Sequence, residues 1–352
     1  MDGYPRFVPP TPSHSRSRSP SPTRKTIALL RNAIPPVKIE PESHIPDDGA
    51  IADAFERFMV THKSAYIPES IGAQLGRLSL LRLETTAVGD VTFGSLDDSL
   101  LLGELDGIIF RAERCERFHQ DENAWGSVIR STLDLMIRLY EERRKRHRDF
   151  EIVDLRSQAI DTQFLPQTTD IVADFAKSFD KRIDFAIAFD IESERVKELQ
   201  SITRHAGSNG SVTLSQMSDT YTQLLPLFCP IEVKRRGGNS EEAELQLAIW
   251  QASALRHRCI KYNEPLKTAQ LTPYLGVPQI SWTVVGHTWT PHLSWYTAEE
   301  GLILVPINGA DLGTSNRISL LRLIAVFEEI FIWAKEDFWA DYQQAVHGRI
   351  NS

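Results

Sequence analysis

The sequence has few cysteines, no long apolar run and no excess of basic residues. Its three cysteines, Cys115, Cys229 and Cys259, are too few and too widely spaced for a disulfide framework or a Cys-x-x-Cys metal site, which favours a reducing compartment. No apolar run approaches the ~20 residues of a membrane span. The first residues also lack the apolar core of a signal peptide. We therefore expect an intracellular protein with no membrane contact.

The charge balance excludes one further class of protein. A formal net charge of -8 argues against a protein that binds polyanions over its whole surface, although a local basic patch can still contact phosphates. The 352 residues are 41% hydrophobic, which is compatible with a real core in one large domain or two ordinary ones.

The first fifty residues differ in composition from the rest of the chain. Residues 1–50 hold ten of the 19 prolines and the alternation Ser15-Arg16-Ser17-Arg18-Ser19. A segment of this composition buries too little apolar surface to order itself, so we expect a disordered Ser/Pro/Arg-rich tail. The alternation is compatible with a phosphorylation-regulated or nuclear-targeting segment and equally with a plain solvated tail. A nuclear location depends on this tail alone.

The remaining sequence divides into a helical preface and an α/β region. Apolar residues three and four apart, such as Ile51, Ala54 and Phe58, predict helices within residues 51–120. Residues 121–346 then alternate between helical and strand-like patterns. The expected elements are a helix at 122–148, strands at 150–155, 183–189 and 229–234, a helix at 240–258, a hairpin of 279–285 with 292–296, a strand at 302–305, and a helix at 316–346.

The most informative stretch is Ile231-Glu232-Val233-Lys234, at the end of a short strand. Side chains two apart on a strand point to the same face, so Glu232 and Lys234 project together while Ile231 and Val233 face the opposite layer. The strand at 183–189 contributes a second carboxylate, Asp184. Two carboxylates and one lysine suffice for a hydrolytic site with a hard metal ion.

The donor atoms favour magnesium. Mg²⁺ prefers oxygen ligands and typically takes one or two carboxylates, so Asp184 and Glu232 are candidate ligands, with the Val233 backbone carbonyl as a third. Mn²⁺ is the alternative ion. Lys234 would lie beside the metal-activated water, to orient or deprotonate it or to offset developing negative charge. Against this reading, charged residues on strands are often surface residues, and an E-x-K triplet is common in ordinary proteins.

Five short motifs follow one another along the chain in an informative order. They are Glu122-Asn123-Ala124-Trp125, Arg182-Ile183-Asp184-Phe185, Ile231-Glu232-Val233-Lys234-Arg235, Gln246-Leu247-Ala248-Ile249-Trp250 and Gly286-His287-Thr288-Trp289. Together they resemble the PD-(D/E)XK nuclease superfamily, and more narrowly the fungal PD-(D/E)XK nuclease-like domain proteins. The resemblance covers roughly Glu122 to Tyr342. It departs from the pattern at Ile183, where the superfamily has proline before the first aspartate.

The resemblance implies a fold, an activity and a set of site residues. The fold is α/β, with a restriction-endonuclease-like core of a mixed β-sheet flanked by helices, in residues 121–346. Asp184 and Glu232 would be metal ligands, Lys234 the catalytic lysine, Glu122 an additional acidic residue, and Gln246 a polar residue that reaches the site. The implied activity is Mg²⁺-dependent hydrolysis of DNA or RNA phosphodiester bonds through a metal-activated water.

Several alternatives stay open. Glu122 can equally complement the dipole of its helix, and Gln246 can serve a structural hydrogen bond. For His287 and Trp250, structural roles in the turn and the core are favoured over chemistry. Arg235 and the arginine after it either meet a phosphate backbone or form a solvated turn. The rival to hydrolysis is a catalytically inactive nuclease-fold module that binds nucleic acid or a protein partner, and a purely structural interaction domain that uses the aromatic C-terminal helix is a third reading.

Overall fold

A computed structural model of the chain describes residues 22–59, 66–78, 88–90, 97–144, 148–167, 179, 181–206, 213–259, 276–309 and 311–350. The Arg/Ser alternation of the tail lies outside these residues, as do parts of the helical pattern expected in the preface.

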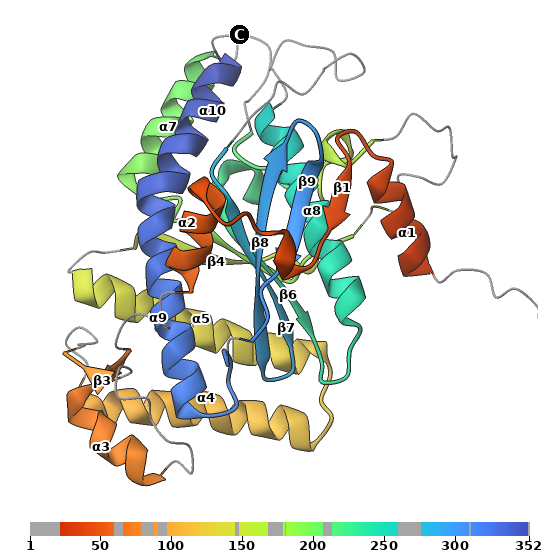
Figure 1. Ribbon diagram of the computed structural model, residues 1–352. Coiled ribbons are helices and arrows are strands. Elements are labelled where there is room, and N and C mark those ends of the chain that lie inside the picture. The colour runs from red at the N-terminus through yellow and green to blue at the C-terminus, as the bar shows by residue number, and fades with distance from the viewer. Residues whose placement is uncertain are drawn as a thin grey trace, which may run out of the picture.

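Seven described strands form one mixed sheet in the order β1-β9-β8-β7-β6-β5-β4 (Figure 1). β1 pairs with β9 and β6 with β7 in parallel, and the other neighbours are antiparallel. The mixed sheet implied by the resemblance is therefore confirmed. The strands are β1 (Val37–Ile39), β4 (Phe150–Asp154), β5 (Phe185–Phe189), β6 (Leu227–Lys234), β7 (Gln279–Val285), β8 (Thr288–Thr297) and β9 (Gly301–Pro306).

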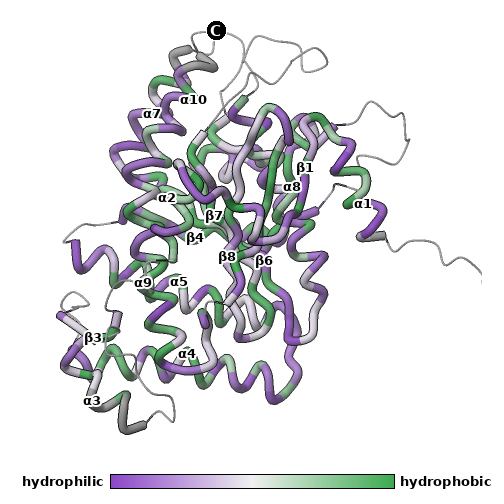
Figure 2. The backbone as a smooth tube through the Cα atoms, viewed as in Figure 1, coloured by the Kyte–Doolittle hydropathy of each residue, from purple (hydrophilic) through white to green (hydrophobic). Residues whose placement is uncertain are grey.

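Helices cover both faces of this sheet. The described helices are α1 (Pro22–Arg31), α2 (Gly49–Phe58), α3 (Glu69–Leu78), α4 (Asp98–Arg117), α5 (Glu122–Arg144), α7 (Glu194–Ala206), α8 (Ser240–Cys259), α9 (Arg317–Trp333) and α10 (Trp339–Ile350). One buried cluster joins the sheet to α4, α5 and α9, and a second joins it to α1 and α8. Apolar stretches accordingly gather on the strands and on the helix faces that meet them (Figure 2).

Strand β5 shows how the sequence separates the two layers. Phe185, Ile187 and Phe189 belong to the cluster with α5, whereas Ala186 and Ala188 belong to the cluster with α8. The two sets alternate because successive strand side chains point to opposite faces. Small residues on one face let α8 approach the sheet closely, while the large aromatics on the other fill the space beneath α5 and α9.

The predicted disorder of residues 1–50 is wrong for the part that the structure describes. Leu30 of α1 and Val37 of β1 are buried against the α8 layer. Strand β1 extends the sheet, and the Leu302 N–H donates to the Pro36 carbonyl at 2.8 Å. A Cβ at position 301 would collide with that carbonyl, so Gly301 permits the pairing. Tertiary contacts therefore supply the order that the local composition does not.

The helices predicted within residues 51–120 are present, as α3, α4 and most of α2. Two short strands, β2 (Ile67–Pro68) and β3 (Val88–Gly89), pair beside α3. These helices share a core with α5 and α9, so they pack directly on the α/β region. The boundaries of the three proposed regions stay a prediction.

The long C-terminal helix is interrupted. Between α9 and α10, residues Ala334–Phe338 form a π-helical segment. Such a segment shifts the faces of the helix that follows it. Here Phe338 and Trp339, although adjacent in sequence, both pack on Phe189, with ring centroids 6.3 Å and 4.7 Å away.

Candidate active site

Strand β6 places the Glu-x-Lys pair as its alternation predicts. Ile231 and Val233 lie in the core beneath α5, and Glu232 and Lys234 project to the other face. The Lys234 Nζ donates to Glu232 Oε1 at 2.8 Å. Glu232 is only 2% exposed, and its second oxygen, Oε2, is buried with no hydrogen-bond partner. A buried carboxylate oxygen without a donor is costly and calls for another ligand.

Asp184 meets this pair from the neighbouring strand. It directly precedes β5, and its Oδ2 accepts a hydrogen bond from the Val233 N–H at 2.7 Å. Its own carbonyl accepts from the Leu155 N–H at 2.9 Å, which fixes the backbone at the end of the β4–β5 pair. The two carboxylates, 48 positions apart in the sequence, therefore converge at one end of the sheet.

The Val233 carbonyl has a suitable direction for a third oxygen ligand. The Lys234 carbonyl accepts from Gly286 N–H at 3.0 Å, on the β7 side of the strand. Carbonyls of successive strand residues point to opposite edges, and each residue's N–H and C=O share an edge. The carbonyl of Val233 therefore faces the edge from which Asp184 approaches.

These side chains line an open pocket with a volume of about 460 Å³. Its walls come from the start of α5, the turn after β4, the start of β5, the end of β6 and the first half of α8. The lining residues are Asp121, Glu122, Asn123, Arg156, Arg182, Ile183, Asp184, Glu232, Lys234, Arg235 and Gln246.

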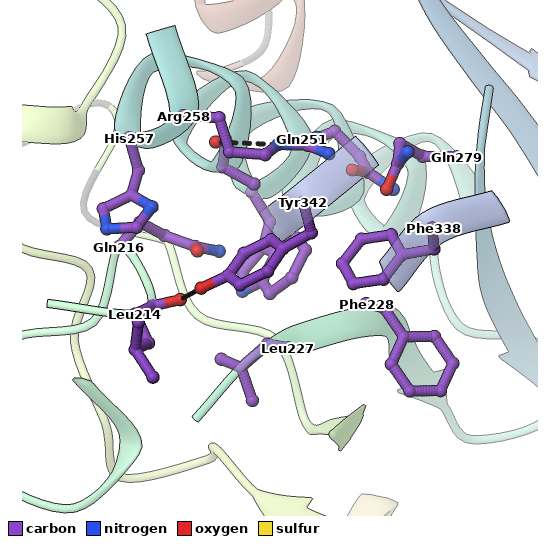
Figure 3. Close-up of a pocket in the computed structure, with 12 residues that line it drawn as sticks. Leu214, Gln216, Leu227, Phe228, Gln251, His257, Arg258, Gln279, Phe338 and Tyr342 are labelled. Carbon is purple, nitrogen blue, oxygen red and sulfur yellow. Dashed lines mark hydrogen bonds between the residues drawn. The ribbon is translucent and has the colours of Figure 1, made fainter. Parts of the chain in front are cut away.

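A second pocket, between α8, β6 and α10, serves as a contrast (Figure 3). It includes Gln251, Arg258 and Tyr342, but its volume of about 10 Å³ leaves room for roughly one water molecule. Of these two pockets, the one at the end of β6 is large enough to admit a substrate.

The electrostatics of the open pocket are dominated by carboxylates. Burial raises the pKa of Asp184. Burial and then the Asp184 charge raise the pKa of Glu232 well above its usual value. Burial alone would lower the pKa of Lys234, but the carboxylates around it, Glu232 foremost, together raise it. Glu122 adds negative charge to all three groups. An excess of negative charge at one point favours a bound cation.

The two weaker candidates, Glu122 and Gln246, also reach the pocket. Glu122 is exposed at the first position of α5, and the neighbouring Asp121 caps the helix by accepting from the Ala124 N–H at 3.1 Å. Gln246 on α8 donates through Nε2 to the Arg182 carbonyl at 2.6 Å. Its Oε1 is buried with no partner, so it is a second acceptor without a donor beside the carboxylates.

Arg156 also lines the pocket, although no motif of the sequence predicts it there. This residue follows β4, and its guanidinium bonds the Asp154 carboxylate and, at 3.1 Å, Asn123 Oδ1. Its guanidinium carbon lies 5.3 Å from the centre of the Phe185 ring. The available signal was an Asp-x-Arg triplet at a strand end, but nothing local places that strand end beside α5.

The two arginines of the turn after β6 have different surroundings. Arg235 lines the pocket, whereas Arg236 pairs with Glu116 of α4. His287 bonds Glu116 at 3.0 Å and Thr314 at 3.2 Å and does not line the pocket. Both ring nitrogens of His287 therefore have partners, as expected of a structural histidine. Trp250 is buried in the α8 core, also as expected.

Within the described residues, no group of three or more His, Cys, Asp or Glu side chains is arranged to hold a metal ion. The three described cysteines are all free thiols. Any cation in this pocket would therefore rely on two carboxylates supplemented by backbone, amide or substrate oxygens. That ligand set is typical of Mg²⁺.

A mixed sheet with α5 and α8 packed on opposite faces, and acidic residues converging at one end of it, defines a nuclease-type α/β fold. A family model of the PD-(D/E)XK nuclease superfamily matches residues 80–339. The chain belongs to this superfamily. Its nucleases generally use divalent metal ions, and their fold suggests a nucleic acid substrate. No curated protein matches the chain. None of the described helices has the length and apolar character needed to cross a membrane.

Proposed function

We propose that this chain is a Mg²⁺-dependent phosphodiesterase of nuclease type that hydrolyses DNA or RNA. One observation carries the proposal: Asp184, Glu232 and Lys234, which come from two strands, line a single open pocket. An inactive nuclease-fold module would not require this combination.

The residues of the pocket fit a hard divalent cation. Glu232 Oε2 and Gln246 Oε1 are buried acceptors with no donor, and Asp184 adds a second carboxylate. With the Val233 carbonyl, these groups offer only oxygen, the ligand atom that Mg²⁺ and Mn²⁺ prefer. When bound, the cation would act as a Lewis acid toward the phosphodiester and make a nearby water more acidic.

Three side chains of the pocket would contribute to hydrolysis beside the cation. Lys234 is held in the pocket by its 2.8 Å bond to Glu232, and its ammonium would offset the negative charge that a phosphate oxygen gains in the transition state. The Arg156 guanidinium, positioned by Asp154 and Asn123, lies at the rim of the pocket and would bind a flanking phosphate. Gln246, tied to the Arg182 carbonyl, would orient a water or a ligand through Oε1.

The test is cleavage of end-labelled single- and double-stranded DNA and RNA in Mg²⁺, Mn²⁺ or EDTA. Wild-type protein should cut at least one of these substrates in metal and none in EDTA. Lys234→Ala should lower kcat by about 10²-fold or more, as expected when charge stabilisation in the transition state is lost. Lys197→Ala, a surface lysine of α7 that pairs with Glu192, is the matched control and should cut like wild type.

Unchanged cutting by Lys234→Ala would reject the proposed mechanism. Binding without cutting, in every metal, would instead identify the inactive module.

A further inference from the structure

The outer face of α4 is the most unusual surface of the described chain. The described part of the chain has five large exposed hydrophobic residues, and three of them lie on α4 or directly after it. These three are Leu100, Phe110 and Phe118, each at least 60% exposed. Phe110, Arg114 and Phe118 are spaced by four residues and therefore line up on one side of the helix. Arg111 and Arg117 flank this line. We call these five residues, Phe110, Arg111, Arg114, Arg117 and Phe118, the α4 Arg/Phe face.

The arginines of this face are available for a ligand. The guanidinium carbon of Arg114 lies 6.0 Å from the Phe110 ring centre, and that of Arg117 lies 5.7 Å from the Phe118 ring centre. In the described part of the chain, no carboxylate forms an ion pair with Arg111, Arg114 or Arg117.

Three acidic residues of α4 are paired with side chains outside this face. Glu104 pairs with Arg138, Asp106 with Arg317, and Glu116 with Arg236. The exposed Glu113 precedes Arg117 by four residues and lies beside it, so the face has three arginines against one neighbouring carboxylate. The α4 Arg/Phe face is therefore locally basic on a chain whose net charge is -8.

The C-terminal end of the helix that carries this face lies near the candidate active site. On the opposite side of α4 from the face, Glu116 bonds Arg236, two residues beyond Lys234, and His287 in the β7–β8 turn. Four residues after Phe118, the chain reaches Glu122, which lines the pocket. Figure 1 shows α4 beneath α5 at the base of the molecule, and these bonds join its C-terminal end to the turn that follows β6.

We propose that the α4 Arg/Phe face binds an unpaired segment of nucleic acid beside the bond to be cut. The inference rests on the proposed function and adds a substrate class to it. Exposed phenylalanines stack on free base faces, which a duplex conceals, and the arginines neutralise phosphates. Phe110 and Phe118 are about 12 Å apart along the helix axis, far enough for each ring to stack on a different base.

A second copy of the chain fits this face less well. A two-fold symmetric contact places the same patch against itself, so the arginines of one copy would face those of the other. Nucleic acid supplies the opposite charge.

The test measures binding of fluorescent single strands and matched duplexes by anisotropy in EDTA, so that cleavage cannot interfere. Phe110→Ala with Phe118→Ala should weaken single-strand binding on the order of tenfold or more and change duplex binding by less than about twofold. Arg114→Gln with Arg117→Gln should reduce the slope of log K against log salt by about one for each phosphate that the protein no longer neutralises. Leu100→Ala, equally exposed on the same helix but outside the face, is the control.

The outcomes separate this inference from the proposed function. Lys197→Ala, the surface control on α7, should bind single strands like wild type. If the wild-type enzyme cuts but the α4 variants bind and cut single strands normally, the assignment of the α4 Arg/Phe face is wrong and the proposed hydrolase activity is kept. If no substrate is cut but the α4 variants lose single-strand binding, the binding role of the face is kept and the hydrolase activity is rejected. Equal losses for single strands and duplexes, or a change only in oligomeric state, would overturn the assignment.

Discussion

Replacing Asp184 with asparagine should stabilise the metal-free protein. The carboxylate is largely buried, and Glu232 and Glu122 lie close enough to add repulsion. Asparagine has nearly the same shape, and its side-chain oxygen can still accept the Val233 N–H bond, which is 2.7 Å long in the wild type. The substitution therefore removes a buried charge without opening a cavity. We expect the free energy of unfolding to rise by about 1 kcal/mol, the usual size of gain when a functional site is relaxed.

Magnesium should make wild-type protein more stable than the Asp184→Asn variant. A ligand that binds only the folded state stabilises it by about 2.7 kcal/mol at a concentration of 100 Kd. For 352 residues, 1 kcal/mol corresponds to about 1.4 °C in Tm. Wild-type protein should therefore gain about 4 °C at 100 Kd of Mg²⁺, while Asp184→Asn, with one ligand weakened, should gain much less. In EDTA the variant should melt about 1.4 °C above wild type.

Calorimetry in EDTA and across a Mg²⁺ titration would measure both effects. Asp154→Asn is the matched control: this aspartate lies at the end of β4 beside the pocket, and the hydrogen bond from Arg156 lowers its pKa. Its loss should slightly destabilise the protein and leave the Mg²⁺ response intact. The reasoning would be refuted by an Asp184→Asn variant that melts below wild type in EDTA, or by equal Mg²⁺ shifts in both proteins.

Two further predictions concern the strands around the site. Gly286 has φ +59°, and a Cβ there would lie 3.2 Å from the Cβ of Arg236. Gly286→Ala should therefore lower the free energy of unfolding in urea by about 1–2 kcal/mol, and it should lower kcat because the Gly286 N–H holds the Lys234 carbonyl. A fully stable variant would contradict this. Burial lowers the pKa of His292 from 6.5 to about 4, so the folded state keeps this imidazole neutral. The contribution of the neutral imidazole to the free energy of unfolding is complete above pH 6.5, and roughly 3 kcal/mol of it is lost as the pH falls toward 4. His292→Asn, whose amide can replace the ring N–H bond to the Thr290 carbonyl, should remove this part of the acid sensitivity, and urea titrations at pH 7.5 and pH 5 would show whether it does.

The local elements of the fold could be predicted because their causes are local. A run of alternating or apolar residues fixes strands such as β7, and a helix such as α8 begins at Ser240 and ends near Cys259, as its pattern indicates. The pairing of Glu232 with Lys234 is equally local, since it follows from the two-residue period of a strand. The approach of Asp184 to this pair is not local. The order of the motifs along the chain predicts this approach, and the hydrogen bond from the Val233 N–H to Asp184 supplies its physical basis.

The features that escaped prediction all depend on distant parts of the chain. Strand β1 orders because the edge of β9 offers it unpaired backbone groups, a circumstance that the proline-rich segment itself does not encode. Arg156 becomes part of the pocket only because α5 presents Asn123 to it. The π-helical segment at Ala334–Phe338 forms where Phe338 and Trp339 must both reach the same core phenylalanine. In each case tertiary packing overrides or supplements the local preference.

Charged groups form two separate clusters, an acidic one in the pocket and a basic one on α4. Asp184, Glu232 and Glu122 concentrate negative charge where a divalent cation would bind, and that same charge would repel a polynucleotide unless something nearby compensated for it. The α4 Arg/Phe face would supply such compensation, because it lies on the helix that the Arg236–Glu116 pair joins to the turn after β6. A bound cation and a basic flank would therefore act together, and neither is visible in a net charge of -8. For the same reason, raising salt should weaken substrate binding through α4 far more than it weakens the cation site, which is partly buried and less screened.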